Sequence, residues 1–415
     1  MQTYQTSFPR ASIWLSFSGF LLVGLGGGAG GVLLPSLGAF YHQGDAVLGT
    51  LFLVSALSYT ISSLSCGPLA ARLGLHWLLA LGTGVLLVGF LGFILELPFS
   101  FLYVARLCYG VGIGIIETGF NIYLSSLPKR TTLLNNLHAF YGVGALLGPL
   151  LATGMLSLLF GWNMIYVVLA ILNLLLLGSV LFIMRQPVSA QASRQEQKPT
   201  REKNLLGAAL ALPLLWIVSF FLLIYSGVEV CAGSWGYNYL LGMRALSPFV
   251  AGWMISGFGL GLTLGRFVIQ PLSERLGVGL ATLMFALIGS ALLSLLLIWL
   301  LPFSLGSGLA FSLLGLSLAP IYPVTVALVP RLVPARLEAS AIGVLVGVSI
   351  SGLAFLPWLA GVLAQFQGIW TLPPYLLILS LILLGFWLYL ARPVSASEAR
   401  RKELGSAETG VAQAE

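Results

Sequence analysis

Long apolar runs take up most of this chain and restrict it to a membrane fold. About twelve of the runs are long enough to cross a lipid bilayer, which takes about 20 residues. Only 7% of the 415 residues are charged, far below the roughly 25% typical of soluble proteins. Backbone amides have no water to bond inside lipid, so the runs are predicted to be helices of an all-α, polytopic membrane protein. The expected spans are residues 11–39, 47–71, 77–96, 98–127, 132–159, 162–184, 205–241, 246–271, 276–301, 303–330, 337–366 and 370–391.

Basic residues near the ends of the expected spans predict the orientation, because Lys and Arg favour the cytoplasmic side. With the N-terminus in the cytoplasm, the basic residues that flank the spans fall on that side, except Arg244. Both termini are therefore expected in the cytoplasm, in a plasma membrane or a bacterial inner membrane. This topology accounts for the net charge of +7 without a nucleic-acid or acidic partner, so membrane lipid is the expected surrounding.

The chain divides into two similar halves around a polar stretch. The expected order is a six-helix bundle at residues 1–185, a cytoplasmic linker at 186–204, a second six-helix bundle at 205–392 and a disordered tail at 393–415. An internal repeat supports the division, because GPLAARLGL, from Gly67, recurs as QPLSERLGV from Gln270, 203 residues later. Duplicated halves are typical of transporters whose substrate site lies near the bilayer midplane, where the halves meet.

The repeated segment resembles the cytoplasmic loop signature of the major facilitator superfamily, in which Gly, an acidic residue, Arg and Gly join paired helices. The matching residues are Gly67, Arg72 and Gly74 in the first copy, and Glu274, Arg275 and Gly277 in the second. The first copy has Ala71 at the acidic position, so the resemblance implies that the second copy carries most of the gate's charge relay. A tight turn with an arginine that reaches the membrane surface is the alternative for both loops. The resemblance also implies two pseudo-symmetric six-helix bundles that alternate access by rocking.

Glu117 is one of two acids in the interior of the expected spans, and its setting indicates a proton site. It lies in GVGIGIIETGFN, a stretch that is otherwise apolar and rich in glycine. A carboxylate in the middle of a membrane helix is costly, so it faces the bundle interior and pairs or binds a proton. Arg106, Glu117 and Asn121 share one helix face, but Arg106 is about 16 Å from Glu117 along the axis and needs another partner or an aqueous cavity. A structural acid bonded to a neighbouring helix is the alternative for Glu117.

The next span begins with NNLHAFYGVGALLGP and places Asn135, His138 and Tyr141 close behind Glu117. These three are candidate substrate contacts, with packing as the alternative role, and no second His or Cys suggests a metal site. GIGIIETGFN and NNLHAFYGVGALLGP together resemble the fourth and fifth helices of the fucose permease branch, the fucose–galactose–glucose:proton symporters. The resemblance implies that Glu117 matches the branch glutamate, which takes a proton or a sugar hydroxyl, and that Asn121 matches the asparagine after it.

The first span departs from that branch. It contains GLGGGAGGVLLP, from Gly24 to Pro35, where the fucose permease carries an aspartate. The resemblance then implies that coupling runs through Glu117 or Glu229, or that transport is uncoupled. The glycines themselves predict a close helix contact and a bend, because small residues let two backbones approach.

The seventh span carries the second acid, Glu229, in YSGVEVCAGSWGYNYL. Tyr225, Trp235 and Asn238 surround it in sequence, and rings, a carboxylate and an amide together suit the faces and hydroxyls of a sugar. An aromatic belt at the outer surface is the alternative for the rings. The glycines of this stretch also predict a bend or a break in the helix.

Two further features of the C-terminal half predict local geometry. Three prolines in SLAPIYPVTVALVPRL predict a hinge or a cavity lining in the tenth span, with Tyr322 as a possible contact. Arg266 lies toward the cytoplasmic end of the eighth span and is expected to extend its charge to the membrane surface.

These observations predict a monomeric secondary transporter that carries a sugar or a similar small polar solute, with a proton as the coupling ion and sodium as the other possibility. The proton-coupling candidates are Glu117 and Glu229. One alternative is export of an amphipathic, drug-like compound, and another is a nutrient sensor that does not transport. The sequence contains no catalytic triad, phosphate loop or metal-ligand set, so neither an enzyme nor a bound cofactor is expected.

Overall fold

The computed structural model describes residues 10–128, 130–183 and 205–412. Twelve helices in this part are long and apolar enough to cross a membrane. No strand occurs in the same part of the chain, so the all-α, polytopic class is confirmed. The helices are α1 (Arg10–Tyr41), α2 (Asp45–Leu73), α3 (Leu75–Ile94), α4 (Phe99–Ser125), α5 (Arg130–Ser157), α6 (Met164–Ile183), α8 (Leu205–Leu210), α9 (Pro213–Gly242), α10 (Pro248–Arg275), α11 (Leu280–Leu300), α12 (Ser304–Leu318), α13 (Ile321–Leu332), α14 (Glu338–Gln367) and α15 (Leu372–Ala412), with the 3-10 helices η1 (Ala335–Leu337) and η2 (Ile369–Thr371).

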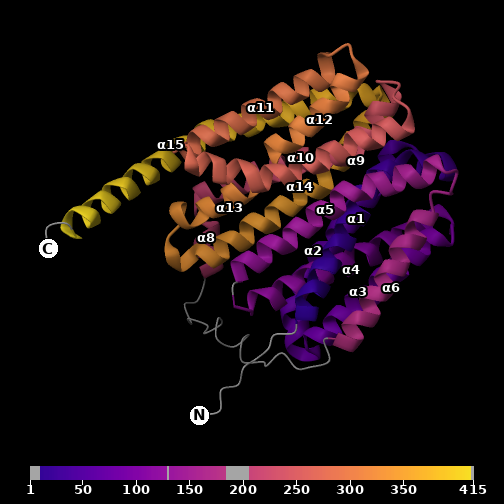
Figure 1. Ribbon diagram of the computed structural model, residues 1–415, viewed down its shortest axis with the longest axis horizontal. Coiled ribbons are helices and arrows are strands. Elements are labelled where there is room, and N and C mark those ends of the chain that lie inside the picture. The colour runs from indigo at the N-terminus through magenta and orange to yellow at the C-terminus, as the bar shows by residue number, and fades with distance from the viewer. Residues whose placement is uncertain (1–9, 129, 184–204, 413–415) are drawn as a thin grey trace. The chain divides into compact units, whose positions relative to one another are not determined.

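Three segments differ from the sequence predictions. The seventh span is divided into α8 and α9, and α9 runs unbroken through the glycines where the sequence predicts a bend or a break, so no break occurs there. One of those glycines serves packing, because a Cβ at Gly227 would overlap Leu356 of α14. The tail predicted to be disordered continues α15 as helix to Ala412 (Figure 1). The linker predicted at residues 186–204 lies outside the described residues, so the division of the bundles at that point stays a prediction.

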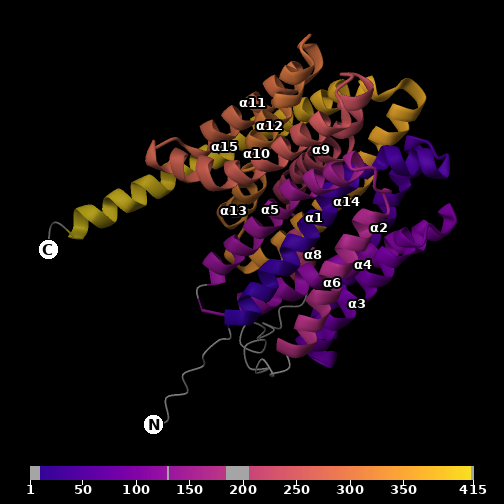
Figure 2. The ribbon, with the colours of Figure 1, turned by 45° about the vertical axis from the view of Figure 1, so that its right-hand side comes forward.

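The chain forms two compact units, one of Met1–Thr200 with Ser247–Gly259 and one of Arg201–Leu246 with Leu260–Glu415. In the first unit, α1 packs along α5, and α3 packs against both α4 and α6 (Figure 2). The second unit repeats this pattern, because α9 packs along α14, and α11 packs against both α12 and α15. The structure therefore repeats the first half's helix pairing in the second half, as the sequence repeat predicts.

Glycines bring the paired helices into backbone contact. A Cβ at Gly24 would overlap the carbonyl oxygen of Tyr141, and one at Gly144 would overlap the carbonyl oxygen of Leu21. In the second unit, a Cβ at Gly352 of α14 would overlap the carbonyl oxygen of Leu223 of α9. The predicted role of the first-span glycine run, close helix contact, is thereby confirmed.

Arg244 follows α9 and binds the end of α11. Its Nη1 donates to the carbonyl oxygen of Leu301 at 2.8 Å and its Nη2 to that of Trp299 at 2.7 Å. Nη2 also donates to the carbonyl of Ile298, and the guanidinium lies 5.7 Å from the ring centre of Tyr239. The last carbonyls of a helix lack intrahelical donors and carry partial negative charge. The one flanking arginine that the topology predicts outside the cytoplasm thus caps a helix.

Candidate functional site

Glu117 lies on α4 and is held by a tyrosine of α2. Tyr59 Oη donates a hydrogen bond of 2.7 Å to Glu117 Oε2. The glycines of GVGIG make this contact possible, because a Cβ at Gly114 would meet the Tyr59 carbonyl oxygen at 2.7 Å and would also overlap Ser62 Oγ. One residue on, Thr118 shares a 2.7 Å hydroxyl hydrogen bond with Ser63 of α2. Close approach of the two helices therefore places a neutral donor on the carboxylate.

The other two members of the predicted polar face do not contact that carboxylate. Asn121 Nδ2 donates to the backbone carbonyl of Glu117 at 2.9 Å, within its own helix. Arg106 is only 8% exposed, and its guanidinium lies 5.5 Å from the ring centre of Phe93 and 5.2 Å from that of Tyr109. Its Nε has no hydrogen-bond partner among the described residues. In its unit, Arg106 therefore has aromatic partners.

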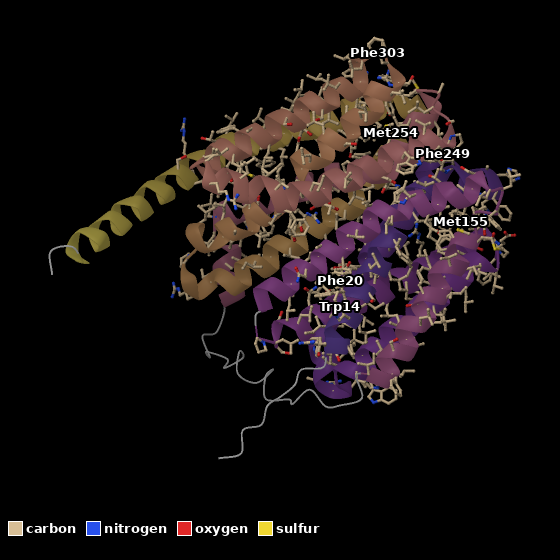
Figure 3. The ribbon with its side chains drawn as sticks, in the orientation of Figure 1. Trp14, Phe20, Met155, Phe249, Met254 and Phe303 are labelled. Carbon is tan, nitrogen blue, oxygen red and sulfur yellow. The ribbon has the colours of Figure 1, made fainter. Side chains whose placement is uncertain are left out.

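The predicted contacts on α5 lie beside α1. The His138 ring meets the Phe20 ring edge to face, with 5.4 Å between centres, and Trp14 meets Phe140 in the same way at 5.9 Å. Figure 3 labels Trp14 and Phe20 on the same stretch of α1. Tyr141 is half-buried, with its hydroxyl 3.7 Å from a Cβ built at Gly27. The side chain of Asn135 lies outside the described residues.

Glu229 of α9 is paired with an arginine of α10. Arg266 Nη2 lies 3.4 Å from Glu229 Oε1, and the two side chains are 29% and 22% exposed, respectively. Tyr225 donates its hydroxyl hydrogen to the other oxygen, Oε2. The prediction that Arg266 extends to the membrane surface is wrong, because an acid lies within reach inside the unit and an intramembrane charge is stabilised by such a partner.

A helix break adjoins this pair. The tenth span is interrupted between α12 and α13, where Pro320 and Pro323 lack the N–H groups that would bond the carbonyls of Leu316 and Ala319. Gly265 packs α10 against the break, since a Cβ there would lie 2.6 Å from both the Leu316 carbonyl oxygen and the Ala319 Cβ. The prolines thus interrupt the helix beside Arg266, and their predicted role as a hinge or a cavity lining stays a prediction.

Three aromatic or amide candidates of the second unit have different surroundings. Tyr322, at the start of α13, has its ring centre 6.2 Å from that of Tyr225. Trp235 is fully buried and donates its Nε1 hydrogen to the Pro357 carbonyl at 2.9 Å, so it neither stacks on a solute nor forms an outer belt. Asn238 is half-buried, and its Oδ1 has no hydrogen-bond partner in the described part of the chain.

The two predicted gate loops are shorter than the sequence suggests. α2 stays helical through Gly67 to Leu73, so only Gly74, with φ of 82°, forms the turn. α10 likewise continues to Arg275, and Gly277 turns with φ of 67°. Both glycines adopt a backbone conformation that other residues rarely take. Arg72 and Arg275 are exposed, whereas the side chain of Glu274 lies outside the described residues.

The partners of the two intramembrane acids, Glu117 and Glu229, were not identified from the sequence. Tyr59 belongs to a polar stripe of the second span that includes Ser55 and Ser62, four residues before it and three after it. That helical spacing is a signal that would have identified the face directed at Glu117. Arg266 was recognised, but nothing in its local sequence indicates that it faces Glu229.

Known proteins resemble this chain along most of its length. The Major Facilitator Superfamily profile matches residues 16–243 and 230–412. Bypass of stop codon protein 6 of Saccharomyces cerevisiae is 26% identical over 85% of this chain and 77% of its own length. The glucose/mannose transporter GlcP of Bacillus subtilis is 22% identical over 77% of this chain and 80% of its own.

Solved structures share the fold. A bacterial homologue of the human lysosomal transporter Spinster aligns with a TM-score of 0.79 at 16% identity, over 94% of this chain and 99% of that one. A D-xylose-proton symporter aligns with a TM-score of 0.72 at 16% identity, over 92% and 98%. With twelve membrane-length helices, a repeated helix pairing and a family profile that matches nearly the whole chain, this protein belongs to the major facilitator superfamily and is a multi-pass membrane transporter.

Proposed function

We propose that the protein moves a sugar or a similar small polar solute across the cell membrane by alternating access, coupled to an inward flow of protons. It acts as a monomer with both termini in the cytoplasm, the side favoured by its flanking basic residues. Two resemblances support the substrate class: the relative GlcP is a glucose/mannose transporter, and one structural neighbour is a D-xylose-proton symporter.

The observation that carries the proposal is the environment of Glu117. Within the described residues this intramembrane carboxylate forms no ion pair, and its hydrogen-bond partner is the neutral hydroxyl of Tyr59. A carboxylate without a counter-ion is costly in a membrane, and a bound proton removes that cost. Glu117 is therefore suited to take up a proton from water on one side and release it to water on the other.

Tyr59 can serve both protonation states of Glu117. An ionised carboxylate accepts the phenol hydrogen, and a protonated carboxyl still has an oxygen that accepts it. The hydrogen bond at 2.7 Å therefore holds the side chain in place while its charge changes. A neutral carboxyl is also cheaper to occlude than a carboxylate, so protonation favours the step in which the loaded carrier reorients.

The test is uptake of labelled glucose, fucose and xylose into proteoliposomes, first with an inward proton gradient and then with a sodium gradient at equal pH. Wild-type protein is expected to accumulate one of these sugars under the proton gradient. Glu117→Gln should lose accumulation by about tenfold or more yet still exchange internal for external sugar, because exchange needs no net proton movement. Glu96→Gln is the matched control, since Glu96 is an exposed acid outside the spans.

Three results would contradict the proposal. Accumulation by Glu117→Gln equal to that of wild type would remove Glu117 from coupling. Accumulation driven by sodium alone would show that sodium, and not the proton, is the coupling ion. Expulsion of a hydrophobic dye, without uptake of any sugar, would make the protein an exporter.

A further inference from the structure

The contact between Glu229 and Arg266 is a long ion pair. Its N–O distance is 3.4 Å, longer than the about 2.7–2.9 Å of a charge-assisted hydrogen bond. The other carboxylate oxygen accepts the hydroxyl of Tyr225, so Glu229 keeps a partner if the guanidinium moves. Both side chains of the pair also remain partly exposed within their unit. This geometry suits a pair that opens.

We propose that Arg266 binds an acidic group of the transported solute, which takes the place of Glu229 when Glu229 is protonated, so that the substrate class is the sugar acids and similar hydroxylated carboxylates. The inference rests on the proposed function and names the substrate of that transporter more narrowly. It also gives Glu229 a role separate from that of Glu117.

Charge balance at the site supports an exchange of partners. With Glu229 ionised, the pair is neutral; with Glu229 protonated, Arg266 and a bound carboxylate are again neutral together. A protonated Glu229 without the solute leaves an uncompensated cation, and an ionised Glu229 with the solute adds an uncompensated anion. Uncompensated charges are costly inside a membrane protein, so one proton and one carboxylate enter together. The proton comes from water on the entry side and returns to water on the exit side.

Few other ionisable groups compete at this position. On α9 itself the neighbours are the Tyr225 phenol and the Cys231 thiol, and α13 contributes the Tyr322 phenol. α15 contributes Tyr375, whose hydroxyl donates to the Leu356 carbonyl at 3.1 Å. The described side chains of α8, α12 and α14 include no ionisable group. Among the described side chains of this part of the unit, Arg266 is thus the cation that faces Glu229.

A helix break lies beside Arg266. The carbonyls of Leu316 and Ala319 lack their usual helix donors, but Gly265 packs directly against both residues and Ala319 is fully buried. Discontinuous helices occur at the substrate or ion sites of many transporters. The hydroxyl groups of the proposed solute therefore follow from the sugar class of the proposed function, and Arg266 accounts for its acidic group.

The test compares acids with their neutral counterparts in proteoliposomes that hold the full-length protein. The probes are labelled glucuronate, galacturonate and gluconate, with glucose and galactose as the neutral sugars, under an inward proton gradient. Wild-type protein is expected to accumulate at least one acid. Arg266→Gln should reduce that accumulation by about tenfold or more, Arg266→Lys should retain part of it, and Arg392→Gln, which changes an exposed arginine of α15, should leave it unchanged.

Binding measured as thermal stabilisation by the transported acid tests the role of Glu229. Glu229→Gln mimics the protonated state, so at one fixed pH it should bind the acid at least about threefold more tightly than wild-type protein does. Equal or weaker binding of the acid by folded Glu229→Gln would overturn this exchange of partners.

The outcomes separate this inference from the proposed function. Proton-driven uptake of a neutral sugar that none of the three acids inhibits would overturn the inference and leave the proposed function standing. Absence of uptake of every sugar and acid, from folded protein, would overturn both. Full acid uptake by folded Arg266→Gln would also overturn the inference. If that variant does not fold, two measurements still test the inference. They are the inhibition of wild-type sugar uptake by the three acids and the acid accumulation by Arg266→Lys.

Discussion

Breaking the Glu229–Arg266 pair should destabilise the protein, and removing both charges should cost less than the sum of the single changes. At 3.4 Å the attraction is at most about 5 kcal/mol for an effective dielectric constant of about 20. Losing one partner of a fully buried pair costs about 3–5 kcal/mol, whereas exposed pairs contribute about 0–1 kcal/mol. With exposures of 29% and 22%, this pair lies between those limits. We expect Glu229→Gln and Arg266→Gln each to cost about 2–3 kcal/mol, since each leaves an unpaired charge.

The double variant should cost about 2 kcal/mol less than the two single changes added together, because it leaves no uncompensated charge. The assay is SDS-induced unfolding of the purified chain in mixed micelles, followed by tryptophan fluorescence. A matched cycle at Ser290 and Ser317, whose hydroxyls share a 2.7 Å hydrogen bond in the same unit, should give only about 0.6 kcal/mol of coupling. Additivity of the charged pair within about 0.5 kcal/mol would refute the reasoning.

Two further predictions concern packing and capping. Gly144→Ala should destabilise the first unit by about 1–3 kcal/mol, because the new Cβ overlaps the Leu21 carbonyl; Gly154→Ala, which meets open space on the same helix, should be neutral or stabilising. Equal yields and thermal stabilities of the two variants would contradict the packing role. Arg244→Gln should cost about 1–2 kcal/mol through the lost α11 cap, while Arg72→Gln, at an exposed arginine, should cost less than about 0.5 kcal/mol in the same unfolding assay.

Helix identity and approximate bounds were predictable because they depend on local chemistry. Every backbone amide in lipid must be bonded within its own helix, so an apolar run of sufficient length has one main solution. The interruption of the tenth span was also predictable in place, because Pro320 and Pro323 remove particular hydrogen bonds. The glycines of α9, by contrast, do not break the helix, since lowered helix propensity is overridden where Gly227 packs against Leu356.

The candidate site was only partly predictable. The two intramembrane acids stand out in the sequence because charge is rare there, and both accept tyrosine hydroxyls in the structure. Their partners do not stand out. Trp235 shows the reverse case, a residue that the sequence predicts to contact substrate and the structure does not. It lies near Glu229 in sequence, but in the fold it is a buried side chain that is hydrogen-bonded to the backbone of α14.

The sequence by itself determined that the chain is helical, crosses the membrane many times and repeats one half in the other, because span length, apolarity and duplication are properties of the chain alone. Only the tertiary structure decided which polar side chains meet. Tyr59 reaches Glu117 across 58 residues of sequence, and Arg266 reaches Glu229 across 37. Such pairs depend on the rotation and spacing of neighbouring helices, which close glycine contacts set to within an ångström or so, and no local pattern of residues specifies both.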